Sequence, residues 1–123
     1  MNLLERIDHW VGVAPTATAH ISGDRKLTFG QLGAYSNALA GHLLERYGDD
    51  RAPVAVLGHR EPEMVVAFLG VVKSGRPYVP IDTALPDERI QHILAIAKPT
   101  LVLTPQETIK LSELGKSTPQ RRL

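Results

Sequence analysis

The amino-acid sequence predicts an α/β fold in which an N-terminal helix and a β-hairpin precede a β-α-β-α-β unit with a parallel sheet. Three observations support this prediction. Unbroken apolar runs at residues 53–57, 78–81 and 100–104 are typical of strands buried on both faces. Segments with apolar residues at helical spacing separate these runs. Turn-forming residues lie between two short strand-like stretches nearer the N-terminus.

The first part of the chain contains the predicted helix and hairpin. Apolar residues recur at helical spacing over residues 3–11, which predicts a short amphipathic helix that ends before Pro15. The turn-forming run 22–25 lies between predicted strands at 17–21 and 26–29. Thr28, with Gln31 three residues later, predicts a capping box at the start of a longer helix over residues 30–47. Gly48 suits the end of that helix, because glycine adopts positive φ without steric cost.

The rest of the chain alternates strands and helices. A helix that is apolar nearly all round is predicted over residues 63–74, and an amphipathic helix over 87–98. Because the three strands are continuously apolar, we expect helices on both faces of a parallel sheet. Pro80 within a strand indicates an edge position, a bulge or an early strand end. Residues 106–114 could form one more helix, and residues 116–123 are polar and without pattern, which predicts a disordered tail.

Composition excludes several classes of protein. A chain of 123 residues is one small domain or part of a larger one, and 43% hydrophobic with 22% charged residues is typical of a globular protein. A net charge of +1 predicts no strong attraction to nucleic acid or to anionic membranes. There is no cysteine, no apolar run of about 18 residues and no apolar leader free of acids, so we expect a cytoplasmic protein.

Phosphate-binding loops are absent in both of their glycine-rich forms. Gly75 follows a predicted helix, so the turn at 73–76 is interpreted as a helix end and not as an anion-binding loop. The loop at 58–63 follows the first parallel strand, at the sheet edge where ligands usually bind. His59 and Arg60 there could contact an anionic group. The alternative, which we favour because loop position alone is weak support, is a solvated loop with Glu61 or Glu63 near the positive start of the next helix.

No other pattern predicts catalysis or metal binding. Adjacent helical acids such as Asp87 and Glu88 do not face each other, and no serine lies in a Gly-x-Ser-x-Gly motif. The histidines do not combine at i, i+4 spacing with a third ligand nearby. They are His9, His20, His42, His59 and His92. We therefore predict no catalytic, cofactor-binding or metal-binding residue in this chain.

Two segments resemble motifs of the adenylate-forming (AMP-binding) enzyme superfamily, whose members activate carboxylates with ATP. Residues 27–32, Leu-Thr-Phe-Gly-Gln-Leu, together with Ser36, Asn37, Leu39 and Ala40, are similar to an early motif of that family. Residues 68–82, Phe-Leu-Gly-Val-Val-Lys-Ser-Gly-Arg-Pro-Tyr-Val-Pro-Ile-Asp, are similar to a core motif, with Ser74 and Pro77 in place of two alanines.

The resemblance covers about residues 17–104 and implies that residues 1–115 form a partial N-terminal lobe of an adenylation domain, with 116–123 as its tail. The family's phosphate loop, its acidic ribose-binding motif, its hinge and its C-terminal domain with a catalytic lysine have no counterpart here. The resemblance therefore implies a scaffold fragment that is inactive alone. ATP and Mg²⁺ are implied for the full-length parent and not for this fragment.

Residues 58–64 and 80–90 most resemble the branch of the family that activates D-alanine and transfers it to the phosphopantetheine thiol of a carrier protein, for D-alanylation of lipoteichoic acid. This implies a cytoplasmic ligase whose partners are the remainder of the adenylation domain and the carrier protein, with no nucleic acid and no membrane insertion. One alternative is the adenylation domain of a peptide synthetase acting on another amino acid. A second is a stand-alone α/β protein-binding module, suggested by the very apolar helix at 63–74. A nucleotide-binding domain of another family is disfavoured by the missing glycine loop.

Overall fold

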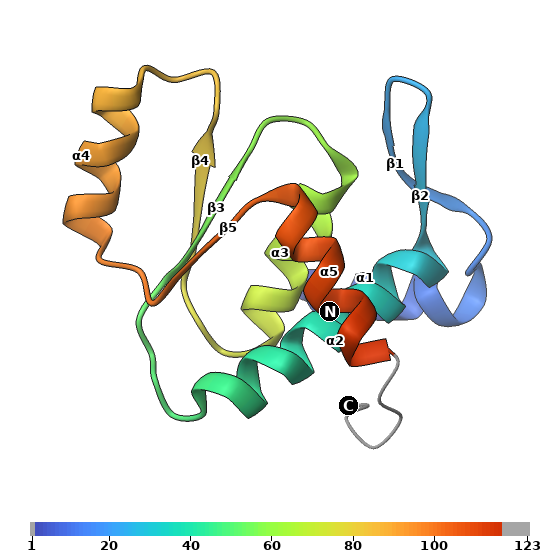
Figure 1. Cartoon of the computed structure of the whole chain (residues 1–123). Helices are drawn as coiled ribbons and strands as arrows, with labels where there is room; N and C mark the ends of the chain where they lie inside the picture. The colour runs from blue at the N-terminus through green and yellow to red at the C-terminus, as the bar shows by residue number, and fades with distance from the viewer. Residues whose placement is uncertain (1, 117–123) are drawn as a thin grey trace.

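The computed structural model describes residues 2–116 of the chain. The elements follow the predicted order, and their bounds differ from the predicted ones by one or two residues (Figure 1). They are α1 (Leu3–Val13), β1 (Thr18–Ser22), β2 (Arg25–Thr28), α2 (Phe29–Tyr47), β3 (Val54–Gly58), α3 (Pro62–Lys73), β4 (Tyr78–Asp82), α4 (Asp87–Ala97), β5 (Leu101–Leu103) and α5 (Pro105–Lys116). The predicted tail lies outside the described residues, apart from Lys116, where α5 ends.

Local sequence signals set the ends of the first two helices. Asn2 caps α1, because its Oδ1 accepts a hydrogen bond from Glu5 N at 2.9 Å. Thr28 and Gln31 form the predicted capping box at α2. Thr28 Oγ1 accepts from Gln31 N at 3.1 Å, and Gln31 Oε1 accepts from Thr28 N at 2.9 Å. Gly48, with φ of 55°, ends α2 as predicted.

The strands form two separate sheets in the described part of the chain. β1 and β2 make the predicted antiparallel hairpin. β3 lies between β4 and β5 in a parallel sheet of order β4-β3-β5. The central position of β3 explains its continuous apolar sequence, since Val54, Ala55 and Val56 are fully buried. β4 is an edge strand, which confirms one of the three interpretations of Pro80, because an edge position tolerates the missing N–H.

The main core lies between one face of the parallel sheet and the helices α2, α3 and α5. Its fully buried residues come from α2, α3, β3 and β5. They are Leu39, Leu43, Val54, Val56, Ala67, Val71 and Leu103. α3 approaches α2 closely at Gly70, where an added Cβ would lie 2.6 Å from Leu39 Cδ2. Only glycine allows the two helices to come so near each other at this point.

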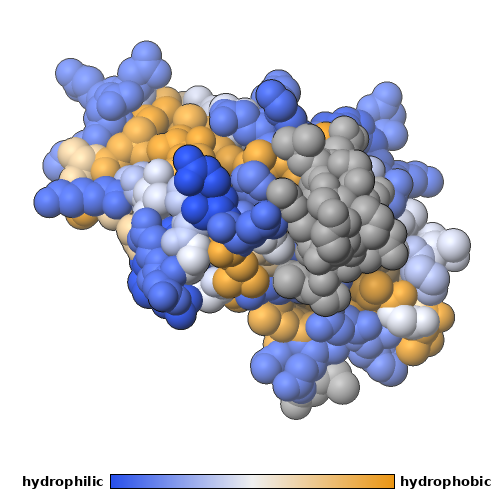
Figure 2. All heavy atoms as spheres, turned by 60° about the horizontal axis from the view of Figure 1, so that its bottom comes forward, coloured by the Kyte–Doolittle hydropathy of each residue, from blue (hydrophilic) through white to orange (hydrophobic). Residues whose placement is uncertain are grey.

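The second face of the sheet is covered less completely than predicted. α4 lies on the opposite side of β4 from α3 in Figure 1, and none of its residues is fully buried. Ile96 of α4 is 70% exposed. On the face drawn in Figure 2, hydrophobic residues form separate patches between projecting hydrophilic side chains. The prediction of helical cover on both faces is therefore only partly met, because α4 packs mainly against β4.

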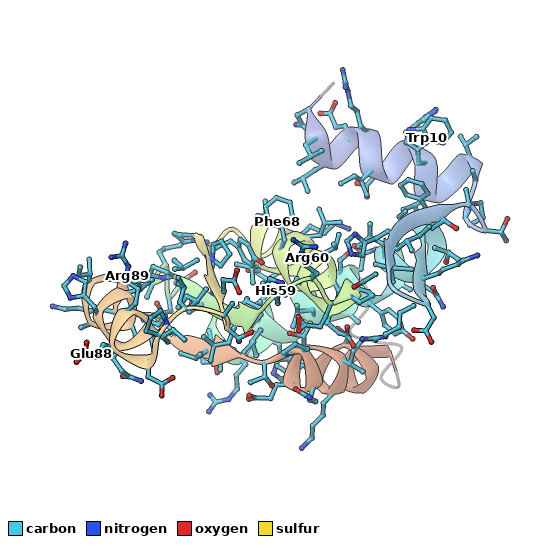
Figure 3. The ribbon with its side chains drawn as sticks, turned by 90° about the horizontal axis from the view of Figure 1, so that it is seen from above. Trp10, His59, Arg60, Phe68, Glu88 and Arg89 are labelled. Carbon is cyan, nitrogen blue, oxygen red and sulfur yellow. The ribbon has the colours of Figure 1, made fainter. Side chains whose placement is uncertain are left out.

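α1 lies at the far end of the molecule from α4 (Figures 1 and 3). None of its residues is fully buried. Trp10 stacks on Phe29 with ring centroids 6.2 Å apart. Val11 packs against Gly33 of α2, where a Cβ would lie 2.8 Å from Val11 Cγ1. α1 is thus held to the body of the protein by its contacts with α2 and by Leu4 and Ile7, which are partly buried against a second core cluster of Leu27, Leu32, Val66 and Leu69.

None of the helices within residues 2–116 has the length and hydrophobicity that a bilayer span requires.

Candidate functional site

The loop after β3 lies at the carboxyl edge of the parallel sheet, and both candidate anion contacts of the sequence are there (Figure 3). His59 and Arg60 are exposed. Glu61 is the N-cap residue of α3, but its side chain makes no capping hydrogen bond. Instead Glu61 Oε1 accepts a hydrogen bond from His59 N at 2.5 Å, and this bond is the largest cause of the lowered pKa of Glu61. The carboxylate therefore orders its own loop.

His59 also joins the carboxyl ends of two neighbouring strands. Its Nδ1 lies 2.9 Å from Asp82 Oδ1, at the end of β4. Asp82 Oδ1 also accepts a hydrogen bond from Ala84 N at 2.9 Å. The bond from Ala84 is the larger cause of the lowered pKa of Asp82, and the His59 bond is the second. Sequence analysis did not pair these residues. A partial signal was available, because both residues follow predicted parallel strands, whose carboxyl ends lie at one edge of a sheet; the register that pairs Gly58 with Asp82 comes only from the structure.

Glu63 is buried, although the favoured interpretation placed it in a solvated loop. Its residue exposure is 9%, and its Oε2 accepts a hydrogen bond from Arg25 Nη2 at 2.6 Å. This bond is also the main reason that the pKa of Arg25 is raised. Arg25 is the first residue of β2, so the Arg25–Glu63 ion pair links the hairpin to the start of α3. Among the described residues, Glu63 Oε1 has no hydrogen-bond partner. The expectation of a solvated Glu63 is wrong, because the hairpin packs beside the start of α3.

Lys73, at the end of α3, connects the two segments that carry the family resemblance. Its Nζ donates to Ser36 Oγ at 3.0 Å and to Asn37 Oδ1 at 2.8 Å, and both acceptors lie on α2. Asp8 of α1 lies 3.7 Å from the same ammonium group. Burial is the main cause of the lowered pKa of Lys73, which the neighbouring Asp8 partly opposes. The motif residues thus meet in a polar junction of three helices, and their role there is to pack the helices together.

The turn after α3 ends a helix, in agreement with its sequence interpretation. Ser74 is the C-cap residue, and Gly75 has φ of 81°, a conformation that glycine adopts without strain. Arg76, which follows, is 4% exposed. Its Nη1 donates to Ala52 O at 3.1 Å, and its guanidinium lies over the Tyr47 ring at 5.1 Å. Arg76 therefore joins the loops at the amino edge of the sheet.

The remaining polar candidates lie on separate elements. Asp87 and Glu88 are exposed in the first turn of α4, far from the β3 loop, as Figure 3 shows for Glu88. His9, His42 and His92 belong to α1, α2 and α4, respectively. Within residues 2–116, no group of three or more histidines and acids is placed to hold a metal ion. The structure brings His59 and Asp82 together, and His20 of β1 lies near them, with its Nε2 3.4 Å from Arg60 O.

Comparison with known proteins finds similar ligases. The D-alanine–D-alanyl carrier protein ligase of Bacillus cereus (strain B4264) is 42% identical over 104 residues, which are 85% of this chain and 21% of the relative. The ligase of the same name from Bacillus anthracis is 41% identical over 109 residues, 89% of this chain and 22% of the relative. The chain thus spans about a fifth of the length of these relatives.

Solved structures share the fold over most of the chain. The nonribosomal peptide synthetase FmoA3 matches with a TM-score of 0.75 and 29% identity, over 85% of this chain and 11% of that one. Klebsiella oxytoca NpsA, in complex with 3-hydroxyanthranilyl-AMSN, matches with a TM-score of 0.76 and 25% identity, over 97% of this chain and 26% of that one. The family model described as AMP-binding enzyme matches residues 7–122. The chain belongs to the AMP-binding enzyme family.

Proposed function

We propose that this chain is part of a ligase that activates D-alanine as an adenylate and transfers it to the thiol of a carrier protein. The observation that supports the proposal most is the 41–42% identity to ligases of that name across 85–89% of the chain. The proposal includes the location and role that the resemblance implies, the cytoplasm and D-alanylation of lipoteichoic acid. The partners are the remainder of the adenylation domain and a phosphopantetheinyl carrier protein.

The proposed reaction starts with in-line attack of the D-alanine carboxylate on the α-phosphate of ATP and ends with a thioester on the carrier. ATP and Mg²⁺ are its cofactors, and the described residues do not fit them. The turns after β3 and α3 have no glycine-rich phosphate loop. Asp87 and Glu88 lie exposed on α4 and are not grouped with a further metal-ligating residue. We therefore assign no step to a residue of this chain.

The contribution of this segment is structural in the proposal. The three-helix junction at Lys73 and the close helix contact at Gly70 hold the motif segments against each other. The matching structures carry this fold within chains of which it covers 11–26%. We expect the isolated chain to show no D-alanine-dependent ATP–pyrophosphate exchange above a blank without enzyme.

A chimera tests the proposal directly. The aligned segment of the Bacillus cereus ligase is replaced by this chain, and ATP–pyrophosphate exchange is measured with D-alanine and with L-alanine. We expect the chimera to retain exchange that prefers D-alanine. A Gly70→Val chimera should lose it by disturbing the α2–α3 contact, whereas the matched Gly12→Ala chimera should not, because a Cβ at Gly12 meets no atom within 4 Å.

Two results would contradict the proposal in different ways. A chimera that folds, as judged by circular dichroism, yet shows no exchange would contradict membership of this segment in a D-alanine ligase. Exchange by the isolated chain would leave the proposed ligase activity intact but would contradict the scaffold role. The two arms therefore separate the activity of the parent from the part that this segment plays in it.

A second candidate is the adenylation domain of a peptide synthetase that acts on another amino acid. It is favoured by the 29% identity and TM-score of 0.75 to FmoA3. Expression of the reading frame extended beyond codon 123 from its source DNA, followed by exchange assays with a panel of amino acids, distinguishes the two. Exchange with D-alanine above all others supports the ligase, and dominant exchange with another amino acid supports the synthetase.

The binding-module alternative loses its motivation in the structure. It rested on an apolar helix that a small sheet would leave uncovered. In α3, however, Val66, Ala67, Leu69 and Val71 are at most 1% exposed. α2 and α5 both pack against α3, while Met64, Val65, Phe68 and Val72 are partly buried.

A further inference from the structure

A surface cavity of about 440 Å³ lies between the hairpin and the loop that follows β3. The hairpin forms one wall, and the loop and the first turn of α3 form the other. The lining residues that matter here are His20, Ile21, His59, Arg60, Glu61, Met64 and Val65. No residue of the Lys73 junction or of the motif segments at 27–32 and 68–82 lines it.

The polar part of the lining contains the Arg60 guanidinium, the Glu61 carboxylate and the imidazoles of His20 and His59. Within residues 2–116, the Arg60 guanidinium makes no hydrogen bond and no ion pair, and the side chain is exposed. The two acids nearby are already engaged by fixed donors. Glu61 accepts from His59 N, and Asp82 accepts from His59 Nδ1 and Ala84 N. Asp82 also attracts Arg60 electrostatically, but neither acid forms an ion pair with the guanidinium, which remains able to bind a ligand.

The other part of the lining is apolar. Ile21 of β1 is 59% exposed, and it borders the cavity together with Met64 and Val65. A cavity with an exposed arginine at its rim and an apolar wall matches ligands that carry an anionic group on an apolar body. Inorganic anions alone would leave the apolar wall in contact with water.

We propose that this cavity binds an organic anion, a phosphate or carboxylate attached to an apolar group, with Arg60 and the imidazoles of His20 and His59 at the anionic end. Arg60 would donate charge-assisted hydrogen bonds to the oxygens, for which its planar fork is suited. Ile21, Met64 and Val65 would contact the apolar body. This inference does not depend on the proposed ligase activity.

The probe is phenyl phosphate, titrated into the isotopically labelled chain while the NMR signals of the His20 and His59 rings and of the Arg60 side chain are followed. We expect saturable shifts at all three. Arg60→Gln should weaken binding about tenfold, the loss expected for one charge-assisted hydrogen bond. The matched variant Arg89→Gln, on exposed α4 at a distance from the cavity (Figure 3), should leave binding unchanged.

Further arms identify the chemistry. Phenylacetate in place of phenyl phosphate shows whether a carboxylate is accepted, and binding of either one supports the proposal. Ile21→Ser should reduce phenyl phosphate binding to the level of inorganic phosphate. The absence of saturable shifts at millimolar probe, or binding that Arg60→Gln does not weaken, overturns the site. Inorganic phosphate binding as tightly as phenyl phosphate overturns the role of the apolar wall. Circular dichroism checks that each variant folds.

Discussion

The contact between Gly70 and Leu39 makes a sharp prediction about stability. In Gly70→Ala, the new Cβ would lie 2.6, 2.8 and 2.9 Å from Leu39 Cδ2, Cγ and Cβ. Carbon atoms prefer about 3.5–4.0 Å, so the helices would have to separate by about 1 Å. Leu39 is fully buried, and its Cβ cannot move away by a change of rotamer.

The magnitude follows from two opposed effects. Overpacking a core costs about 1–3 kcal/mol, and contact with a rigid Cβ places this case at the upper end. Alanine gains about 1 kcal/mol over glycine in a helix. We therefore expect Gly70→Ala to lower the free energy of unfolding by about 2 kcal/mol. Urea unfolding followed by circular dichroism should show the midpoint falling by about 0.7–2 M, given slopes of about 1–3 kcal/mol/M.

Two variants control this experiment. Gly12→Ala makes the same change in α1, where no atom lies within 4 Å of the new Cβ, and should not lower stability. The double variant Gly70→Ala/Leu39→Ala removes the contacts of 2.6 and 2.8 Å with Leu39 Cδ2 and Cγ and keeps only the contact with Cβ, which the helices can relax by moving into the emptied space. Its loss should therefore be smaller than the sum of the single losses by about 1–3 kcal/mol. Unchanged stability of Gly70→Ala would refute the argument that only glycine fits at this crossing.

Three further predictions concern polar groups. Burial raises the pKa of Tyr78 to about 12, so the folded state keeps a proton that the unfolded state loses above pH 10. The contribution of Tyr78 to the free energy of unfolding is present below pH 10 and is lost between about pH 10 and 12, a fall of about 1–2 kcal/mol after allowance for partial exposure. Chemical unfolding at several pH values should show a smaller fall for Tyr78→Phe. An equal fall in this variant would contradict the assignment. Asn37→Ala should cost about 1 kcal/mol by removing an acceptor from Lys73, whereas Asn37→Asp should not reduce stability, because it adds an opposite charge beside the ammonium; equal midpoints of thermal unfolding for both variants would count against the junction. Arg25→Met should cost about 1–2 kcal/mol by leaving the Glu63 carboxylate buried without its partner, and adding Glu63→Gln should restore part of the loss; a double variant less stable than Arg25→Met would overturn this account.

Much of the local structure follows from residues close together in the chain. Thr28 and Gln31 specify the start of α2 because the capping box needs only residues three apart. Gly48 and Gly75 mark helix ends because their positive φ values favour glycine. The order of strands and helices follows from apolar periodicity, which is likewise a local property. For this reason the elements are predictable, with bounds correct to one or two residues.

The candidate site was predictable only in part. The position of His59 and Arg60 at the carboxyl edge follows from the strand that precedes them. The partners of these residues do not follow from the local sequence, because Asp82 is 23 residues from His59 in the chain. The burial of Glu63 depends on Arg25, 38 residues earlier, and its solvated interpretation failed for that reason. A local pattern carries no information about which distant side chain will arrive beside it.

The sequence by itself determined the α/β class, the order of the elements, the turns and the resemblance to one enzyme family. The tertiary structure alone decided that β3 is the central strand, that Lys73 joins three helices, and that α4 leaves one face of the sheet incompletely covered. The physical reason is the range of the interactions. Capping and periodicity act over three or four residues. Burial and ion pairing depend on how whole elements pack, and that packing involves residues far apart in the sequence.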